Sequence, residues 1–305
     1  MTQGPLGILA ALPEEIAGLI ERLETPLPVQ TWGQRDFHRG HLHGRDCVIA
    51  LSRVGKVAAA STATTLISKF DVSAVLFVGV AGGVGTHVHI GDVVIADTLM
   101  QHDMDASPLF PRFEIPLLAR ARFDTSAAWT KALRSAAERY LAKHHARLKA
   151  EALKVQIGNA TPEASASALL AASRAPNVHC GLIASGDRFV SSHEEISALL
   201  AATPDLLAVD MESAAVGQVC HEHLIPVAIL RSISDGANDT AAMSFSQFLT
   251  DVAAHYAGGI LEDLLLQDGL AANAPPPGAE HSAMHETNGD DIKDASPGTQ
   301  AGATV

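Results

Sequence analysis

Two hydrophobic stretches late in the chain end in polar side chains whose types and spacing suit acid-base chemistry. The stretch from Leu206 ends in Asp210 and Glu212, and the stretch from Val227 ends in Asp235, with a helical segment between them. This order is typical of a β-α-β unit, in which ligands bind at the carboxyl ends of the strands. Acids at two such ends therefore converge on one pocket. A single strand-end carboxylate is often only a helix cap or a salt-bridge partner, but the set favours catalysis.

Further candidates stand near these acids in the chain or at another strand end. Arg231 and Ser234 belong to the second stretch. Glu15 follows the first apolar stretch of the chain, where a proline and two acids predict the start of a helix that runs to about Leu23. Glu14 competes with Glu15 for any catalytic role.

The elements that must position these residues alternate between strand and helix. A helix is expected between the second and third strands, with the length and apolar spacing of one packed on a sheet. The alternation favours an α/β fold, a three-layer α/β/α sandwich with a mostly parallel sheet. The predicted strands span residues 6–12, 46–51, 75–79, 91–97 and 181–190, and the helix spans 54–70.

Several later segments have distinct compositions. The alanine-rich, charged segment from Thr125 to Gln156 predicts a solvated helix, which with the polar residues after it forms a surface excursion near 125–178. Capping-box patterns at Ser192 and Ser244 predict the starts of two further helices. Residues 268–305 lack aromatics and are rich in Pro, Gly and acids, which predicts a disordered tail after a domain of residues 1–267.

Composition excludes several classes of function. The chain has 305 residues and a net charge of −13, with no basic stripe, so nucleic acid is not expected as a partner. Its three cysteines are scattered, which argues against a disulfide framework or a structural zinc site and favours a reducing cytoplasm. No signal peptide and no apolar run long enough to span a bilayer is present, so we expect a soluble cytoplasmic protein without membrane contacts.

Motifs for cofactors and metals are weak. The glycines of residues 79–85 match neither the dinucleotide-binding fingerprint nor an ATP-binding loop, and no nucleophile elbow with a plausible triad is present. The histidine pairs at 41 and 43 and at 87 and 89, and the acids around His102, lack a third ligand at a recognisable spacing. We therefore expect neither a cofactor nor a metal.

Taken together, several separate segments resemble the nucleoside phosphorylase/nucleosidase superfamily, and most closely its 5'-methylthioadenosine/S-adenosylhomocysteine nucleosidase branch. They occur in the family's order and at roughly its spacing over most of residues 6–266, outside the excursion and the tail. The matching segments are Leu6–Glu15, Val54–Thr62, Val78–Gly83, Gly91–Asp97, Gly181–Val190, Val209–Ser213 and Arg231–Asp235.

The resemblance implies a mixed, partly barrel-like sheet flanked by helices, a homodimer, and hydrolysis of the N-glycosidic bond of a 5'-thio-adenosine. By the same resemblance, Glu15 activates the water and Arg231 helps to hold it. Glu212 binds the ribose hydroxyls, and Asp235 protonates N7 of adenine. The chemistry asks for the same set, because adenine leaves poorly as an anion and the sugar becomes cationic.

The resemblance also assigns residues that bind the substrate without reacting. Met211 packs on the ribose, Phe189 stacks on the base, and the backbone of Val190 reads the base edge. Val80 replaces the usual Ser or Thr near the water. Ser234 is a further binding candidate, Leu12, Val54 and Phe245 line the 5'-alkylthio pocket, and the loop Leu109–Phe113 reaches into the neighbouring subunit's site.

Two alternative functions remain open at this point. A phosphorylase of this superfamily needs arginines around its phosphate, but the corresponding places hold Phe77 and the acidic turn at Glu15. A non-catalytic nucleoside-binding module with the same fold is the other alternative, against which the presence of all four candidate catalytic residues argues. The sequence also leaves open whether the 5'-group is methylthio, homocysteinyl, deoxy or that of an aminofutalosine.

Overall fold

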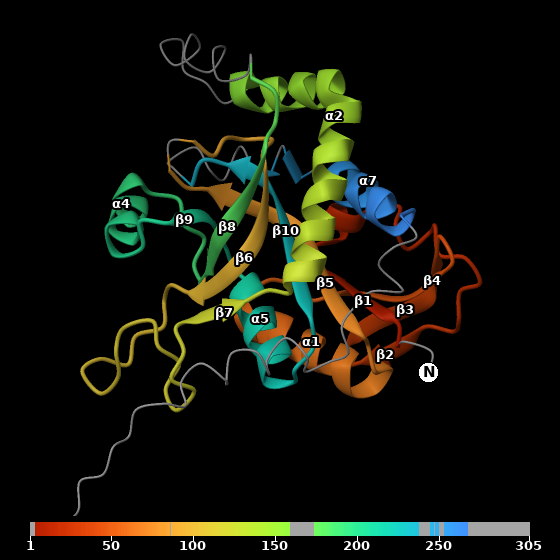
Figure 1. Cartoon of the computed structure of the whole chain (residues 1–305), viewed down its shortest axis with the longest axis horizontal. Coiled ribbons are helices and arrows are strands. Elements are labelled where there is room, and N and C mark those ends of the chain that lie inside the picture. The colour runs from red at the N-terminus through yellow and green to blue at the C-terminus, as the bar shows by residue number, and fades with distance from the viewer. Residues whose placement is uncertain are drawn as a thin grey trace, which may run out of the picture. The chain divides into compact units, whose positions relative to one another are not determined.

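The computed structural model describes residues 4–85, 87–158, 174–237, 245–246, 248–249 and 253–267. Five of its strands close into a barrel, because β10 pairs with β5 as well as with β6. The ring runs β5-β10-β6-β8-β9 and returns to β5 (Figure 1). These strands are β5 (Ala74–Gly83), β6 (Val93–Gln101), β8 (Val178–Ser185), β9 (Leu206–Asp210) and β10 (Val227–Asp235).

The remaining strands extend the sheet beyond the barrel. β1 pairs with β5, and β4, β3 and β2 follow it outward, while β7 pairs with β6. The hairpin of β2 and β3 was not expected from the sequence. The outer strands are β1 (Leu6–Ala10), β2 (Gln30–Trp32), β3 (Arg35–Leu42), β4 (Arg45–Leu51) and β7 (Arg122–Asp124).

The mixed, partly barrel-like sheet is confirmed, but the expectation of a mostly parallel sheet is wrong. Among the described strands, five pairings are parallel and five are antiparallel. The reason is visible after β5, where only a short loop leads into β6. A parallel return needs a crossover of a dozen or more residues, usually a helix, so β6 runs antiparallel to its neighbour β10 instead.

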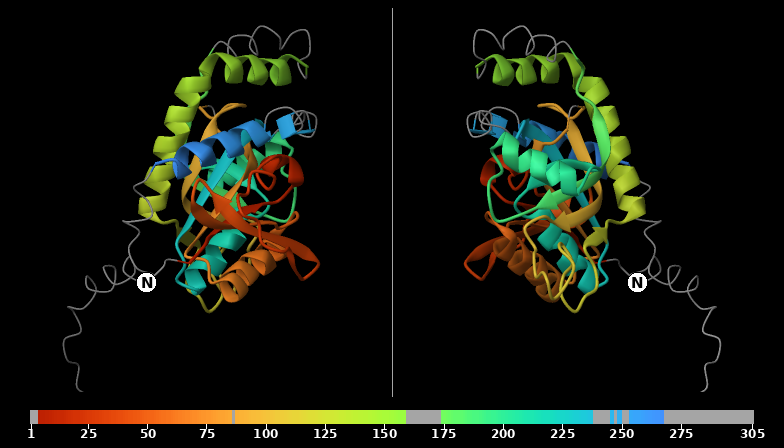
Figure 2. Two further views of the ribbon diagram at one scale, coloured as in Figure 1. Left: turned by 90° about the vertical axis from the view of Figure 1, so that its right-hand side faces the viewer. Right: turned by 90° about the vertical axis from the view of Figure 1, so that its left-hand side faces the viewer.

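Helices cover the sheet on two sides (Figures 1 and 2). α1 (Lys56–Phe70) and α5 (Ser213–Glu222) pack together on one side, while α2 (Ala127–Gly158) and α7 (Ala254–Leu265) pack together on another. Alternating side chains of β5 serve both layers: Phe77 joins the core beneath α1 and α5, and Leu76 joins the core beneath α2 and α7. The expected three layers are therefore present.

Two helical predictions need correction. The chain after β1 forms only η1, a 3-10 turn over Pro13–Ile16, and Gly18, at φ +79°, lies in a backbone region that does not continue a helix. The first half of α2 is not solvated, because Trp129 and Leu133 are buried in the core and the Tyr140 hydroxyl donates to the carbonyl of His255. Alanine between these large residues lowers the apparent amphipathicity of the segment.

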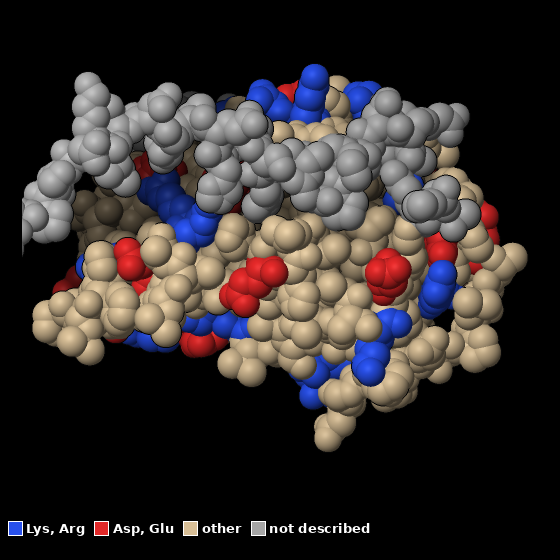
Figure 3. All heavy atoms as spheres, turned by 60° about the horizontal axis from the view of Figure 1, so that its bottom comes forward, with Lys and Arg blue, Asp and Glu red and all other residues tan. Residues whose placement is uncertain are grey.

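Other predictions are confirmed or fall outside the description. α4 (His193–Ala202) begins at its predicted cap, where Ser192 Oγ accepts a hydrogen bond from the amide of Glu195 at 3.2 Å. The box at Ser244, the polar residues 159–173 and the tail 268–305 lie outside the described residues. None of the described helices is both long and apolar enough to cross a bilayer. On the face in Figure 3, the described acidic and basic side chains are interspersed, without a continuous basic stripe.

Candidate active site

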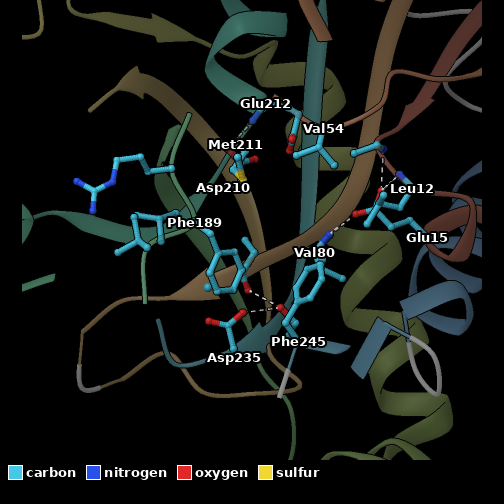
Figure 4. Close-up of a pocket in the computed structure, with 17 residues that line it drawn as sticks. Leu12, Glu15, Val54, Val80, Phe189, Asp210, Met211, Glu212, Asp235 and Phe245 are labelled. Carbon is cyan, nitrogen blue, oxygen red and sulfur yellow. Dashed lines mark hydrogen bonds between the residues drawn. The ribbon is translucent and has the colours of Figure 1, made fainter. Parts of the chain in front are cut away.

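The candidate site is a pocket at the carboxyl ends of β1, β5, β9 and β10, which encloses about 570 Å³ of empty space when its open mouth is included (Figure 4). All eight predicted binding residues and three of the four predicted catalytic residues line it, and the fourth, Arg231, is hydrogen-bonded to the lining residue Asp210. The lining residues are Ala11, Leu12, Glu15, Val54, Val80, Ala81, Gly82, Arg188, Phe189, Val190, Val209, Asp210, Met211, Glu212, Ser234, Asp235 and Phe245.

Glu15 is held rigidly at one end of the pocket. The η1 turn folds it back, so that its Oε2 accepts from the amides of Ala11 at 2.7 Å and Leu12 at 2.9 Å, and its Oε1 accepts from Val80 at 3.1 Å. Burial raises the pKa of Glu15, while the charge of Arg231 and the three amides oppose the shift. Glu14 is exposed to solvent, so Glu15 is the acid that the turn presents to the pocket.

Arg231 faces Glu15 from β10. Its guanidinium stacks on Phe77, with Cζ 4.0 Å from the ring centroid, and its Nε donates to Asp210 at 2.8 Å. A Cβ built at Gly79 would lie 2.6 Å from both Arg231 Nη1 and Glu15 Oε1. Both terminal guanidinium nitrogens are buried and have no hydrogen-bond partner among the described residues. Gly79 therefore lets the Glu15 carboxylate and the Arg231 guanidinium lie close to the backbone of β5, where any larger residue would collide with both.

Asp210 fixes the orientation of Arg231. Besides Arg231, it accepts hydrogen bonds from the hydroxyls of Ser185 and Ser213 and from the amide of Ser213. These serines were not among the candidates, because their role depends on β8 and α5 meeting at the strand end. The position of Asp210, two residues before Glu212, is the sequence signal that could have indicated its role in orienting Arg231.

Glu212 is the residue before α5, and its side chain contacts the start of α1. Its Oε1 accepts from the amide of Gly55 at 2.8 Å, and the residue is 6% exposed. Burial and the nearby charge of Asp210 raise the pKa of Glu212 to about 7, against the opposing effects of Arg231 and the Gly55 amide. Near neutral pH this carboxyl therefore exchanges protons readily.

Asp235 ends β10 at another side of the pocket, away from Glu15 (Figure 4). It is 1% exposed, and its carboxyl accepts from the hydroxyl of Ser234 and the amide of Ala237, both at 2.8 Å. Burial raises the pKa of Asp235, and these two neutral donors offset it only in part. A buried carboxyl without a cationic partner is suited to hold a proton.

Aromatic rings close the pocket beside Asp235. Phe189 and Phe245 meet edge to face, with centroids 5.7 Å apart, and Phe189 remains 41% exposed. The loop Leu109–Phe113 does not line the pocket of its own chain, and Leu109 is 84% exposed. Within the described residues, no three His, Cys, Asp or Glu side chains are grouped as metal ligands.

The family model of the phosphorylase superfamily matches residues 5–265. The chain belongs to this superfamily. It is 32% identical to an aminodeoxyfutalosine nucleosidase of Helicobacter pylori over 85% of this chain and 97% of that protein. It is 31% identical to a 5'-methylthioadenosine/S-adenosylhomocysteine nucleosidase of Hydrogenovibrio crunogenus, with the same coverage. A Neisseria meningitidis nucleosidase solved with methylthio-immucillin-A superposes with a TM-score of 0.71, at 29% identity, covering 86% of this chain and 98% of that one.

Within the phosphorylase superfamily, the surroundings of Glu15 in this chain differ from what a phosphate site requires. Phosphate is a dianion and needs several cationic groups around it. Here the carboxylate of Glu15 lies beside Gly79, and Phe77 packs beneath Arg231 where a second cation is expected in phosphorylases. The geometry therefore favours a neutral nucleophile.

Proposed function

We propose that the protein is a nucleosidase that hydrolyses the N-glycosidic bond of a 5'-substituted adenosine, releasing adenine and the 5'-substituted ribose. One observation carries the proposal: two buried carboxyls in different environments face the same pocket from different sides. Asp235 has only neutral donors, whereas Glu15 lies beside the charge of Arg231. A leaving base and an attacking water need these two environments.

The proton donor in this mechanism is Asp235. Adenine leaves poorly as an anion, so a proton on N7 lowers the barrier to breaking the bond between C1' and nitrogen. The raised pKa of Asp235 keeps its proton available, and the Ala237 amide orients the carboxyl.

The nucleophile is a water at the end of the pocket that Glu15 lines. Glu15 accepts its proton as it attacks C1', and the positive charge of Arg231 beside Glu15 helps to hold the water in place. Val80 contributes its amide to Glu15 rather than a hydroxyl to the water. Glu212, held by Gly55, accepts hydrogen bonds from the ribose hydroxyls, and its negative charge suits the cationic sugar.

The apolar residues divide the substrate between them. Phe189 stacks on the base, Val190 reads its edge through the backbone, and Met211 packs on the ribose. Leu12, Val54 and Phe245 receive the 5'-group, and Ser234 supports Asp235. The similar proteins are named as nucleosidases of 5'-methylthioadenosine/S-adenosylhomocysteine or of aminodeoxyfutalosine. We therefore take methylthioadenosine and S-adenosylhomocysteine as first substrates, with an aminofutalosine as the test of a larger 5'-group.

The proposal extends to assembly and location. The exposed loop Leu109–Phe113 supports a homodimer in which it reaches the neighbouring subunit's site. The nucleosidase domain spans residues 1–267, and the scattered cysteines support a cytoplasmic location.

The test separates hydrolysis from phosphorolysis and from mere binding. Purified protein is incubated with methylthioadenosine in phosphate and in phosphate-free buffer, and adenine and the sugar product are measured. We expect adenine and free methylthioribose at equal rates in both buffers. A ribose 1-phosphate in phosphate buffer identifies a phosphorylase, and binding without adenine release identifies a non-catalytic module.

A further inference from the structure

The first residue of α1, Lys56, occupies a position that helix energetics do not favour. The N-terminal end of a helix is the positive end of its dipole, so a lysine there is disfavoured relative to an acid. The side chain is nevertheless only 15% exposed. Its placement therefore points to a role outside the helix.

The helix start at Gly55 and Lys56 joins two walls of the pocket. The amide of Gly55 donates to Glu212 at 2.8 Å, and the amide of Lys56 donates to Oδ1 of Asp187 at 3.0 Å. Glu212 follows β9, whereas Asp187 belongs to the loop after β8 that carries Phe189. Two successive amides thus hold one carboxylate from each wall.

The ammonium group of Lys56 closes this arrangement into a ring. It donates to Oδ1 of Asp103 at 2.5 Å and to Gln101 at 3.0 Å, and it lies 3.8 Å from Oδ2 of Asp187. The other oxygen of Asp103 accepts from the amide of Asp187 at 2.9 Å. Asp103 therefore binds the lysine and the loop at once.

We propose that Lys56 is a positioning residue, which locks the loop of residues 186–190 against the start of α1 and so holds the base-stacking Phe189 over the pocket. This inference rests on the proposed function. Without the ammonium group, Asp103 and Asp187 repel each other and the loop loses its charge-assisted anchor. Glu15 and Asp235 are held by other contacts, so the effect falls on binding of the base rather than on proton transfer.

The test compares Lys56→Met with Lys56→Arg, and with Lys131→Met as a control at an exposed lysine of α2. We expect Lys56→Met to raise KM for methylthioadenosine and the dissociation constant of adenine about tenfold, the scale of one charge-assisted hydrogen bond. We expect kcat to stay within about threefold, and Lys56→Arg to restore most of the affinity. Lys131→Met should change neither constant.

Asp103→Asn is a second variant, which tests the proposal if Lys56→Met does not fold. We expect it to raise KM for methylthioadenosine as well. An unchanged KM and adenine affinity in folded Lys56→Met, or a lower melting temperature without either change, overturns the proposal. Failure of the proposed function gives a different result, because the wild-type protein then releases no adenine. In that case the adenine affinities of wild type and variants still test the role of Lys56.

Discussion

Two buried aspartates at the ends of neighbouring strands, Asp92 before β6 and Asp235 at the end of β10, have opposite electrostatic environments. Asp92 lies just before β6, where its backbone carbonyl accepts from the amide of Ile233 in β10, two residues before Asp235. The two residues are 0% and 1% exposed. Asp92 accepts hydrogen bonds from Arg174 at 2.6 Å and from His179 at 2.9 Å, whereas Asp235 has only a hydroxyl and an amide.

Burial alone therefore does not decide what a carboxyl does. For both residues burial acts to raise the pKa, but the hydrogen bonds of His179, Asn177 and Arg174 outweigh it and lower the pKa of Asp92. At Asp235 the neutral donors are too weak to do so, and the pKa stays raised. One residue holds a charge that stabilises the fold, and the other holds a proton that can be given away.

The largest expected effect comes from Asp235→Asn. The amide keeps the shape of the side chain but has no acidic proton for N7, so kcat should fall by about 10² to 10⁴-fold, the usual contribution of general acid catalysis. Adenine release measures the loss, and the melting temperature checks that the fold is intact. Turnover within a few-fold of wild type would show that Asp235 is not the acid.

The opposite pattern is expected for Asp92→Asn. This change removes the anion that pairs with Arg174 and should lower the free energy of unfolding by about 3 kcal/mol, at the low end for a buried pair because Arg174 is 31% exposed and can turn to water. Denaturant titration measures it. Adenine release per folded molecule should stay within a few-fold, and a loss as large as that of Asp235→Asn contradicts the division of roles.

Parts of this comparison were accessible from the sequence. Asp235 could be predicted because it ends an apolar strand beside Ser234, and Glu15 because it follows a strand through a proline turn. The role of Asp92 could not, since Arg174 and His179 reach it from more than eighty positions away. The mixed sheet was misjudged from strand-helix alternation alone, because the direction of β6 depends on which neighbour it pairs with. Likewise, the burial of Trp129 could not be predicted from its own helix, because it depends on the packing of α7.

A third buried carboxyl, Glu212, predicts how activity depends on pH. Its pKa is raised to about 7, first by burial and then by Asp210. If the ionised form accepts from the ribose hydroxyls, kcat/KM should fall toward a tenfold loss per pH unit as the pH drops below about 7. Glu212→Gln should have a lower but flatter profile in this range. The matched control, Glu222→Gln at an exposed acid on α5, should keep the wild-type slope.

The contributions of Asp92 and Asp235 to the stability of the protein should depend on pH in opposite directions. The stabilising contribution of Asp92, whose folded pKa is lowered, is present above the unfolded value of about 3.9 and is lost as the pH falls through the folded pKa. The stabilising contribution of Asp235, whose folded pKa is raised, is present below the unfolded value of about 3.9 and is lost as the pH rises through the folded pKa.

The melting temperature of wild type should therefore exceed that of Asp92→Asn most at neutral pH. Relative to Asp235→Asn, wild type should lose stability as the pH rises. Thermal melts of the three proteins between roughly pH 3 and 8 give the two differences. Parallel pH dependences would mean that the two carboxyls share one environment after all.

The smallest effect is expected from the tail. Every contact described for Asp92 and Asp235 comes from residues before 238. A chain truncated after Gln267 should therefore keep the melting temperature, the adenine-release rate and both pH dependences of the full chain. A fall of several degrees, or a lost dimer on a sizing column, would contradict the assignment of residues 268–305 to a dispensable tail.

The most direct test of the central claim follows the two carboxyl groups themselves. Protein labelled with ¹³C at the aspartate carboxyl carbons is titrated by NMR, and the two resonances are assigned by their absence in Asp235→Asn and Asp92→Asn. We predict that Asp235 ionises above the ordinary aspartate value of about 3.9 and that Asp92 ionises below it. An Asp235 resonance that ionises at or below the pH of Asp92 would contradict the account.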